Sequence, residues 1–556
     1  MLECSQIRIT LKQGIHEASI LNAARAKVAA MLSCRPHDLS SLELRRKSID
    51  ARKKQDVHFI VTVRATLREG LDEQTLLSRL PKREQSHIRS INPKEPSFPQ
   101  PVPHALRPKD RPVVVGAGCA GLFAALALAQ AGLEPLLIEM GDDATRRTRA
   151  VETFNSTGKL DPSSNIQFGL GGAGTFSDGK LNTGTKNPIH RLVLQTLVDA
   201  GAPREILVDA KPHIGSDILP AVVTNIVQRI EDAGGTVLFR TRLIDLQRSQ
   251  DGSVSHIIID RSGRSERIQT AHLVLACGHS ARSVFSLLAK RGVRLARKEF
   301  AMGVRIEHLQ CDIDRALYGP AAGHPALGAA PYSLVAHLPN GRSLFSFCMC
   351  PGGEVVAAAS EEGGVVTNGA SLNARAGVNA NAALLVNIRT TDLPGDDPLA
   401  GIELQRACER KAFELGGGEY RAPAQLVGDF LNQTPSCTAG RIKPTYPRGV
   451  TWGEIDDTLP VHVIETLRMG IPALGKKLRG YDDPEAVLTG VETRSSSPVT
   501  IARERSCVSV NTPGLYPCGE GAGYAGGIMS AATDGVRCAQ AVIDSLGSIR
   551  QSHVSA

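Results

Sequence analysis

Aromatic residues and the signature motifs of several enzyme classes are scarce or missing in this sequence of 556 residues. Phe, Trp and Tyr make up 4% of the chain, and Trp452 is the single tryptophan, which argues against a β-propeller and against a surface that stacks nucleic-acid bases. The histidines form no H-E-x-x-H pair and the twelve cysteines form no C-x-x-C knuckle, so we expect no metal site. A G-x-S-x-G nucleophile elbow and a Walker lysine are also missing.

The sequence predicts neither a leader segment nor a membrane span. Glu3 and Ser5 interrupt any short apolar run at its start. The apolar stretch 113–138 holds four glycines and Glu134, which fits strand, glycine turn, helix and strand better than a membrane helix. Widely scattered cysteines are typical of reduced thiols. We therefore expect a soluble, cytoplasmic protein.

The net charge of +8 lies in the first fifth of the chain, since residues 1–110 hold 20 Lys+Arg against 12 Asp+Glu. Its densest part is the basic cluster, defined as Arg45, Arg46, Lys47, Arg52, Lys53 and Lys54. Such a cluster is either a site for an anionic partner such as RNA or a solvated face of a strand and turn.

Hydrophobic periodicity predicts a small N-terminal module over residues 1–80, in the order strand, helix, strand, strand, helix. That order is typical of a ferredoxin-like α/β half-sandwich. Residues 81–110 are rich in proline, which prevents regular structure and predicts an extended linker.

A dinucleotide-binding fingerprint follows the linker. The apolar strand 112–115 runs into Gly116-Ala117-Gly118-Cys119-Ala120-Gly121 and then into the helix 122–131. The three glycines permit a tight turn, the approach of a pyrophosphate and close packing of helix on strand, and the helix N-terminus faces the phosphates. Glu139 ends the second strand, where a carboxylate accepts hydrogen bonds from ribose hydroxyls. The similar run 169–174 has no strand before it, and we reject it as a second fingerprint.

A second glycine turn lies near the C-terminus. Strand 515–518 leads through Gly519-Glu520 and a run of glycines into the helix 528–546. A long cofactor such as FAD needs two backbone clamps, so both turns should open onto one cavity. The alternative is a terminal packing helix with a glycine-rich entry.

These segments resemble the FAD-binding fold of the glutathione-reductase superfamily. More specifically, the chain resembles a family labelled FAD-dependent dehydrogenases or NAD(FAD)-utilizing dehydrogenases. The resemblance covers nearly the whole chain and is carried by the strings Ser48-Ile49-Asp50-Ala51-Arg52, residues 171–181, residues 346–353, Gly490-Val491-Glu492-Thr493-Arg494 and residues 519–527. It implies an α/β fold with an FAD-binding Rossmann domain in two parts, 111–285 and 505–547, an inserted mixed α+β cap or substrate domain, 286–504, and a tail, 548–556.

The resemblance also implies which residues hold FAD. The first turn and Glu139 would bind the ADP half, Leu243 would lie by the adenine, and the second turn would close over the ribityl chain and flavin. The full expected set is Gly116, Ala117, Gly118, Cys119, Ala120, Gly121, Glu139, Gly174, Leu243, Cys277, Gly278, Gly519, Glu520, Gly526, Gly527 and Ile528.

Six residues are candidates for chemistry at the flavin. Lys180, with Asp178 beside it, would stabilise the reduced flavin; the alternative is a surface ion pair. Cys348 and Cys350 form the single closely spaced cysteine pair. The pair is redox-active, lines the site without thiol chemistry, or packs in the core. His279 would act as acid or base and Arg494 would clamp a carboxylate, although a structural hydrogen bond or ion pair explains each equally well.

The sequence therefore predicts an FAD-dependent oxidoreductase that transfers hydride between an organic small-molecule substrate and flavin N5. Whether NAD(P)H reduces the flavin stays open, because no second nicotinamide-binding unit is visible. Two alternatives are an RNA-associated or tRNA-modifying flavoprotein that uses the basic module, and a redox-sensing flavoprotein of low turnover. No motif indicates the substrate or an oligomeric state.

Overall fold

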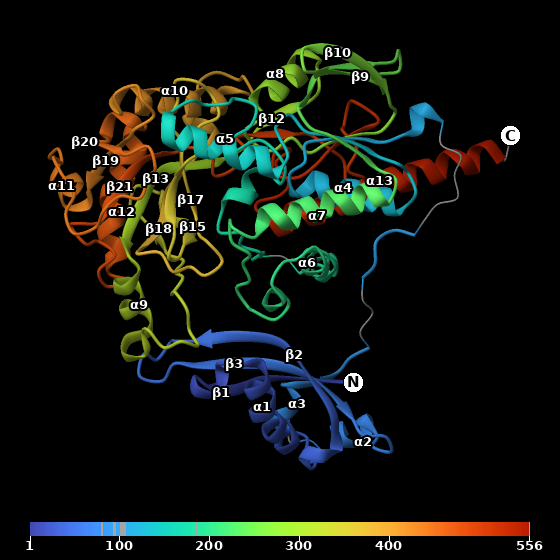
Figure 1. Ribbon diagram of the computed structural model, residues 1–556, viewed down its shortest axis with the longest axis vertical. Helices are drawn as coiled ribbons and strands as arrows, with labels where there is room; N and C mark the ends of the chain where they lie inside the picture. Colours follow the sequence, from blue (N-terminus) through green and yellow to red (C-terminus); the bar gives the residue numbers. More distant parts are fainter. Residues whose placement is uncertain (79, 81, 93–95, 101–106, 185, 555–556) are drawn as a thin grey trace.

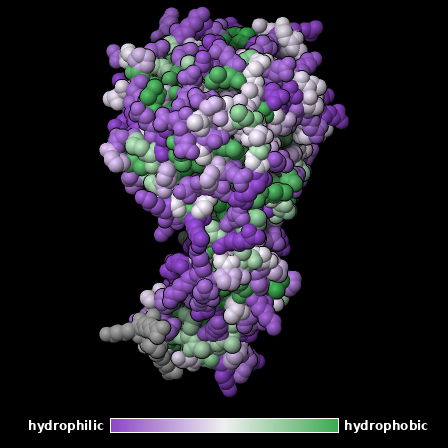
Figure 2. All heavy atoms as spheres, turned by 90° about the vertical axis from the view of Figure 1, so that its left-hand side faces the viewer, coloured by the Kyte–Doolittle hydropathy of each residue, from purple (hydrophilic) through white to green (hydrophobic). Residues whose placement is uncertain are grey.

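Two lobes joined by a narrow waist make up the molecule (Figure 2). In the computed structural model the small lobe is the N-terminal segment and the large body holds the rest of the chain (Figure 1). The structure describes all residues except 79, 81, 93–95, 101–106, 185 and 555–556.

The N-terminal lobe is one antiparallel sheet with helices packed on it, in strand order β2-β3-β1-β4. Its elements are β1 (Leu2–Thr10), α1 (Glu17–Met31), β2 (Leu39–Asp50), β3 (His58–Leu67), α2 (Glu73–Ser78), α3 (Lys82–Gln85) and β4 (Ile88–Ser90). Buried and half-buried side chains alternate along β3, because one face of the sheet covers the lobe's core.

The predicted linker is wrong over its first part. Helix α3 and strand β4 lie within 81–90, and β4 pairs with β1 so that Ser90 lies opposite Leu2. The density of prolines predicted an extended chain there. The pairing of β4 with β1 supplies backbone hydrogen bonds that the spacing of prolines does not reveal. Residues 81, 93–95 and 101–106 of that predicted linker lie outside the described residues.

The waist is built on Lys47 of strand β2. Its backbone N–H donates to the carbonyl of Val208 at 2.7 Å, its own carbonyl accepts from the N–H of Ala210 at 2.8 Å, and its ammonium pairs with Asp209 at 3.4 Å. Elsewhere in the basic cluster, Arg45 pairs with Glu43 and Arg52 pairs with Asp50. Three of the six cations are thus paired with acids of this chain, which weakens the interpretation of the cluster as a site for RNA.

The body contains a parallel sheet of five strands in the order β23-β11-β5-β6-β7. These strands are β5 (Val113–Val115), β6 (Leu136–Ile138), β7 (Thr236–Leu238), β11 (Leu273–Leu275) and β23 (Leu515–Pro517). They are short. Their side chains are mostly apolar on both sides because both faces of the sheet are covered.

One face of the parallel sheet carries helices and the other carries a second sheet. Helices α4 (Cys119–Gln130), α7 (Leu219–Asp232) and α13 (Ile528–Val554) share a core with Val114, and lie together in Figure 1. Val113 and Val115 instead point to a core shared with α8 (Arg282–Lys290) and an antiparallel sheet, β10-β9-β8. That sheet consists of β8 (Thr241–Arg248), β9 (Val254–Arg261) and β10 (Arg264–Gln269).

Strands β7 and β8 follow one another closely in the sequence but belong to different sheets. Arg240 lies between them with a φ of 52°, and β8 leaves the parallel sheet at this point. The guanidinium of Arg240 pairs with Asp142 and with Asp161, so ion pairs hold this left-handed residue in place.

A sheet of seven strands, in the order β14-β15-β18-β13-β21-β19-β20, fills the segment predicted as a cap. Its strands are β13 (Phe300–Leu309), β14 (Val335–His337), β15 (Ser343–Cys350), β18 (Asn379–Ile388), β19 (Ala422–Leu426), β20 (Val450–Trp452) and β21 (Val487–Glu492). Two short pairs accompany it: β12 (Leu295–Arg297) with β22 (Val499–Ile501), and β16 (Glu354–Ala357) with β17 (Thr367–Ala370).

The remaining helices of the body surround these sheets. The helices are α5 (Ala144–Thr157), α6 (Ile189–Asp199), α9 (Gln310–Tyr318), α10 (Ala400–Leu415), α11 (Val427–Asn432) and α12 (Val461–Gly475).

Helix α13 runs farther than predicted. The sequence indicated an end at residue 546 and a tail over 548–556, whereas the helix continues to Val554; residues 555–556 lie outside the described range. Across the described ranges, every helix falls short of the combined length and apolar character that a bilayer span requires.

The packing of α13 on α4 gives a test of the fold. A Cβ atom on Gly535 would lie 2.1 Å from the carbonyl oxygen of Ala120, so Gly535→Ala should force the two helices apart. We expect the melting temperature to fall by about 3 °C or more, because overpacking costs about 1–3 kcal/mol. Gly547→Ala, in the same helix, meets nothing within 4 Å and is the matched control. Circular dichroism on heating measures both, and an unchanged melting temperature for Gly535→Ala would contradict the close packing.

Candidate functional site

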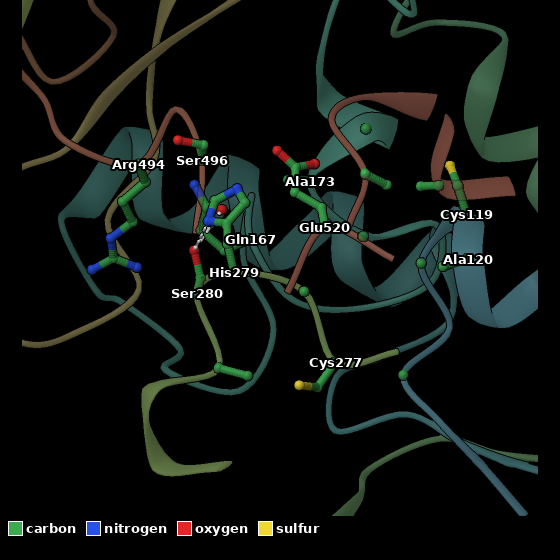
Figure 3. Close-up of a pocket in the computed structure, with 18 of the residues that line it drawn as sticks. Cys119, Ala120, Gln167, Ala173, Cys277, His279, Ser280, Arg494, Ser496 and Glu520 are labelled. Atoms are coloured by element: carbon green, nitrogen blue, oxygen red, sulfur yellow. Dashed lines mark hydrogen bonds between the residues drawn. The ribbon is translucent and has the colours of Figure 1, made fainter. Parts of the chain in front are cut away.

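A cavity of about 680 Å³ lies between the parallel sheet and the seven-stranded sheet. It opens beyond the carboxyl ends of β5, β6 and β11, the position at which parallel sheets bind ligands. Gly116 and Gly118 of the first turn line it, and so do Gly526 and Gly527 of the second. The two glycine turns therefore open onto one cavity, part of which Figure 3 shows in close-up.

The glycines of the first turn have separate roles. Gly116 has a φ of 99°, and a Cβ there would lie 2.5 Å from the carbonyl oxygen of Ala276. A Cβ on Gly121 would lie 1.8 Å from the carbonyl oxygen of Gly116, so Gly121 permits the helix to approach the strand. On Gly118 the nearest atom would be 3.8 Å away, which leaves the backbone of that residue open to a ligand in the cavity.

Glu139 is held by three backbone amides. Its carboxylate accepts from the N–H of Ala117 at 2.8 Å, of Gly141 at 2.9 Å and of Gly169 at 3.0 Å. It lines the cavity beside the first turn, where the sequence predicted a partner for ribose hydroxyls. Ala117 and Gly121 do not line the cavity: Ala117 is buried and supplies an N–H to Glu139, and Gly121 packs against the turn.

The glycine run 169–174 forms a wall of the cavity. A 3₁₀ turn (Gly172–Phe176) begins within it, and the N–H of Gly171 donates to the carbonyl of Ala117 at 2.8 Å. This run lacks a preceding strand, in agreement with our rejection of it as a second fingerprint. Lining residues of the run and of the segment after it include Gly171, Gly172, Ala173, Gly174, Ser177 and Lys180.

The C-terminal turn brings Glu520 and the start of α13 to the cavity. Burial raises the pKa of Glu520 to about 7, against the opposing effect of Lys298. Gly519 does not line the cavity; its N–H donates to Asp534 at 2.8 Å and so fixes the turn. The other expected cofactor residues that line the cavity are Cys119, Ala120, Leu243, Cys277, Gly278 and Ile528.

Lys180 and Asp178 lie at different depths. Lys180 lines the cavity, whereas Asp178 is buried behind it, forms an ion pair with Lys180 at 3.0 Å and accepts a hydrogen bond from Arg375 at 2.8 Å. Burial lowers the pKa of Lys180, but Cys350, Cys348 and Asp178 outweigh that effect and raise it above its ordinary value. Lys180 is therefore a charged ammonium at the cavity wall, whereas Asp178 does not line the cavity and pairs with Lys180 from behind it.

Arg494 is engaged by side chains of this chain. Its guanidinium forms a bidentate pair with Glu409, at 2.9 and 2.8 Å, and also donates to Ser360. Arg282 pairs with the same carboxylate, and the two guanidinium groups lower the pKa of Glu409 to about 2 although burial acts in the opposite direction. Arg494 lines the cavity, yet these contacts favour the structural ion pair over a clamp for a substrate carboxylate.

His279 belongs to a hydrogen-bonded chain that the sequence did not reveal (Figure 3). The hydroxyl of Ser280 donates to Gln167 at 3.0 Å and lies 3.1 Å from Nδ1 of His279, which assigns the proton to Nδ1. Burial, with Arg494 and Arg282 nearby, lowers the pKa of His279 to about 4, so the ring is neutral at pH 7. Ser280 adjoins a predicted strand end and was within reach of sequence reasoning, whereas no motif marks Gln167.

The two cysteines of the C-x-C pair also differ. Cys348 lines the cavity and Cys350 is buried, without lining it. Burial raises the pKa of Cys119 and of Cys277, the other thiols near the turns, to about 12. Those two are therefore un-ionised at pH 7.

One group of potential metal ligands occurs in the described part of the chain. Cys518, Asp534 and Cys538 bring their ligand atoms within 4.8 Å of one another. The guanidinium of Arg503 pairs with Asp534 at 2.7 Å and lies 3.4 Å from the thiol of Cys538. A cationic side chain thus already contacts two of these three groups.

The sequence matches three family models. Residues 114–169 match an NAD(P)-binding Rossmann-like domain, residues 299–495 match a model described as FAD-dependent protein, C-terminal domain-like, and residues 1–66 match a domain of unknown function. An uncharacterized protein of Clostridium beijerinckii is 44% identical over 526 residues, which cover 94% of this chain and 96% of that protein.

This chain and the Clostridium protein belong to one family. Members with the matched C-terminal domain are described as FAD-dependent, which confirms the predictions of a nucleotide-binding Rossmann domain and of FAD as the cofactor. The cavity fits that cofactor: its volume is in the range of ligand sites, and it joins an open glycine backbone, an acid and the starts of two helices.

Solved structures of flavoproteins give weak overall similarity. The glycerol-3-phosphate dehydrogenase of Bacillus halodurans in complex with FAD is 12% identical, with a TM-score of 0.35 over 78% of this chain and 64% of that chain, a little under two thirds of its length. The 3-ketosteroid-Δ4-(5α)-dehydrogenase of Rhodococcus jostii is 12% identical, with a TM-score of 0.33 over 78% of this chain and 95% of that chain.

The first turn gives a test of cofactor binding. Gly118→Val adds a side chain whose Cβ would lie no closer than 3.8 Å to its nearest neighbour, and we expect it to project where the cofactor's phosphates approach. We expect a folded protein whose FAD content falls by about tenfold or more, because losing those backbone contacts costs more than about 1.4 kcal/mol. Gly453→Val, where an added Cβ meets nothing within 4 Å, is the control and should keep its colour. Absorbance of the purified proteins measures the flavin, and a fully yellow Gly118→Val variant would contradict this position for the pyrophosphate.

Proposed function

We propose that the protein is an FAD-dependent oxidoreductase that transfers hydride between an organic substrate, or NAD(P)H, and flavin N5. The observation that carries this proposal is the opening of both glycine turns onto one cavity, together with a charged lysine in its wall. Bound flavin supplies two-electron transfer, and the protein supplies position, charge and protons.

In this proposal the first turn and Glu139 bind the ADP half of FAD. The start of α4 directs its free N–H groups to the pyrophosphate, and Leu243 contacts the adenine. Glu520 and the start of α13 hold the ribityl chain and flavin. Lys180 offsets the negative charge that develops on the reduced flavin.

The cap side of the cavity is the proposed place for the substrate. Strands β15 and β18 present aromatic, aliphatic and amide side chains to it, which suits an organic molecule with a few polar groups. The residues on this side include Phe345, Phe347, Asn368, Leu385 and Asn387. A nicotinamide cofactor would use the same space, because a second dinucleotide fingerprint is missing from the sequence.

We also propose the finer structural assignments. The strand order β2-β3-β1-β4 supports a ferredoxin-like class for the N-terminal lobe, and the two-part parallel sheet supports a glutathione-reductase-type FAD domain. The seven-stranded sheet would be the cap, within domain limits close to 286–504. The structure favours neither the RNA-associated nor the redox-sensing alternative, and internal ion pairs already occupy half of the basic cluster.

Anaerobic reduction tests the proposed function. We expect NADH or NADPH, added separately, to bleach the flavin absorption bands of the purified protein. Lys180→Met should keep its FAD but be reduced about 100-fold more slowly, the usual effect of removing one charge-stabilising group. Lys290→Met, at an exposed position on α8, is the matched control. If the flavin of Lys180→Met bleached at the rate of the unaltered protein, Lys180 would have no role in flavin reduction.

Glu520 gives a test by pH. Since burial raises its pKa to about 7, Glu520 is protonated at pH 6 and ionised at pH 8. An added negative charge beside the flavin disfavours reduction, so the reduction potential should fall more steeply across this interval than in Glu520→Gln. Equilibration with reference dyes measures the potentials. Glu414→Gln, on the exposed face of α10, should behave as the unaltered protein, and equal slopes in all three proteins would place Glu520 away from the flavin.

A further inference from the structure

The cysteine pair in strand β15 interrupts the regular strand. Phe347 lies opposite Ala383 and Cys350 lies opposite Asn381, so three steps along β15 correspond to two along β18. Cys348 lies in this bulge with a φ of 42°, a conformation that costs a non-glycine residue free energy. Bulges and strained residues of this kind re-aim side chains at functional sites.

The bulge separates the environments of the two thiols. Cys348 is half-buried and lines the cavity, whereas Cys350 is fully buried behind it. The thiol of Cys350 lies 3.2 Å from the carbonyl oxygen of Cys348, so the two residues are in direct contact. One accessible thiol backed by one buried thiol is the arrangement of an attacking and a resolving cysteine.

The surrounding charges favour a thiolate on Cys348. The neighbouring thiol of Cys350 lowers the pKa of Cys348 most, and Lys180 and Arg305 lower it further, although burial and Asp178 oppose them. The interaction with Cys348, together with burial, raises the pKa of Cys350. Arg305 also donates to the carbonyl of Cys348 at 3.1 Å and so fixes the backbone of the bulge. The two thiols are thus differentiated into a nucleophile and a proton-bearing partner.

We propose that Cys348 and Cys350 form a redox-active dithiol that reduces a disulfide substrate bound in the cavity. Cys348 is the nucleophile and Cys350 is the resolving cysteine. The proposal names a substrate class for the site described above, and it extends the oxidoreductase function to thiol–disulfide exchange.

The exchange balances within the dithiol and the substrate. The Cys348 thiolate attacks one sulfur of the disulfide R–S–S–R, a mixed disulfide forms, and one R–S⁻ leaves. Cys350 loses its proton to that leaving thiolate and attacks the sulfur of Cys348, which expels the second R–S⁻; this thiolate takes up a proton from solvent. The products are two R–SH and a Cys348–Cys350 disulfide, which two electrons and two protons return to the dithiol. Only the source of these electrons, bound reduced FAD, rests on the proposed function.

A small aromatic disulfide, dithiodipyridine, tests the pair in the full-length protein. After reduction and removal of the reductant, the unaltered protein should release about two equivalents of pyridinethione in a fast phase, one for each step of the exchange. Cys350→Ser should release about one and retain the probe on Cys348, as peptide mass spectrometry would show. Cys348→Ser should lose the fast phase. Cys437→Ser, which removes an exposed cysteine elsewhere, is the control and should keep it.

The dependence of the fast phase on pH tests the role of charge. The rate should persist at pH 6, where an ordinary thiol with a pKa of about 8.5 reacts slowly. Lys180→Met should shift the profile to higher pH. Two results would overturn the proposal: a fast phase that survives in Cys348→Ser, or release of a single equivalent by the unaltered protein.

This test is independent of the flavin reaction. A protein that NAD(P)H bleaches but that shows no fast phase would lose the dithiol and keep the proposed oxidoreductase function. A protein with the fast phase but with flavin that no nicotinamide reduces would keep the dithiol and lose NAD(P)H as the donor.

Discussion

The site depends on the contact between helices α4 and α13. Gly535 of α13 lies against the carbonyl of Ala120, and no larger residue fits between the two helices. Because each helix begins at a glycine turn, this single contact brings both turns to the same cavity, although about 400 residues separate them in the sequence. The sheet positions each turn, and the helix contact sets the distance between them.

Charge is the second organising constraint of the cavity. Three cations near it are each paired with an acid: Lys180 with Asp178, Arg305 with Glu492, and Arg494 with Glu409. Burying an unpaired charge would cost several kcal/mol, so these pairs are a condition of forming a cavity with polar walls. Both Lys180 and Arg494 line the cavity, but the guanidinium of Arg494 is held by Glu409 and Ser360 together, whereas Lys180 pairs with Asp178.

Local sequence patterns predicted the parts of the fold that depend on residues close together in the sequence. The strand, turn and helix around 113–131 and the turn at 519–527 follow from glycine spacing and apolar runs, and both were predictable. The environment of Arg494 was not, because its partners Glu409 and Ser360 come from distant segments and no spacing rule links them. The bulge at Cys348 could not be predicted for a related reason. In a regular strand residues 348 and 350 lie on one face, but one extra residue in β15 separates them.

Glu139 shows how the chain prepares for its ligand. Three amide N–H groups hold its carboxylate in a single orientation within the folded protein. The loss of rotamer entropy for this side chain therefore occurs during folding, and under the proposed function it does not recur when a ribose binds. Preorganisation of this kind converts each new hydrogen bond into affinity more completely than a flexible acid at the same position would.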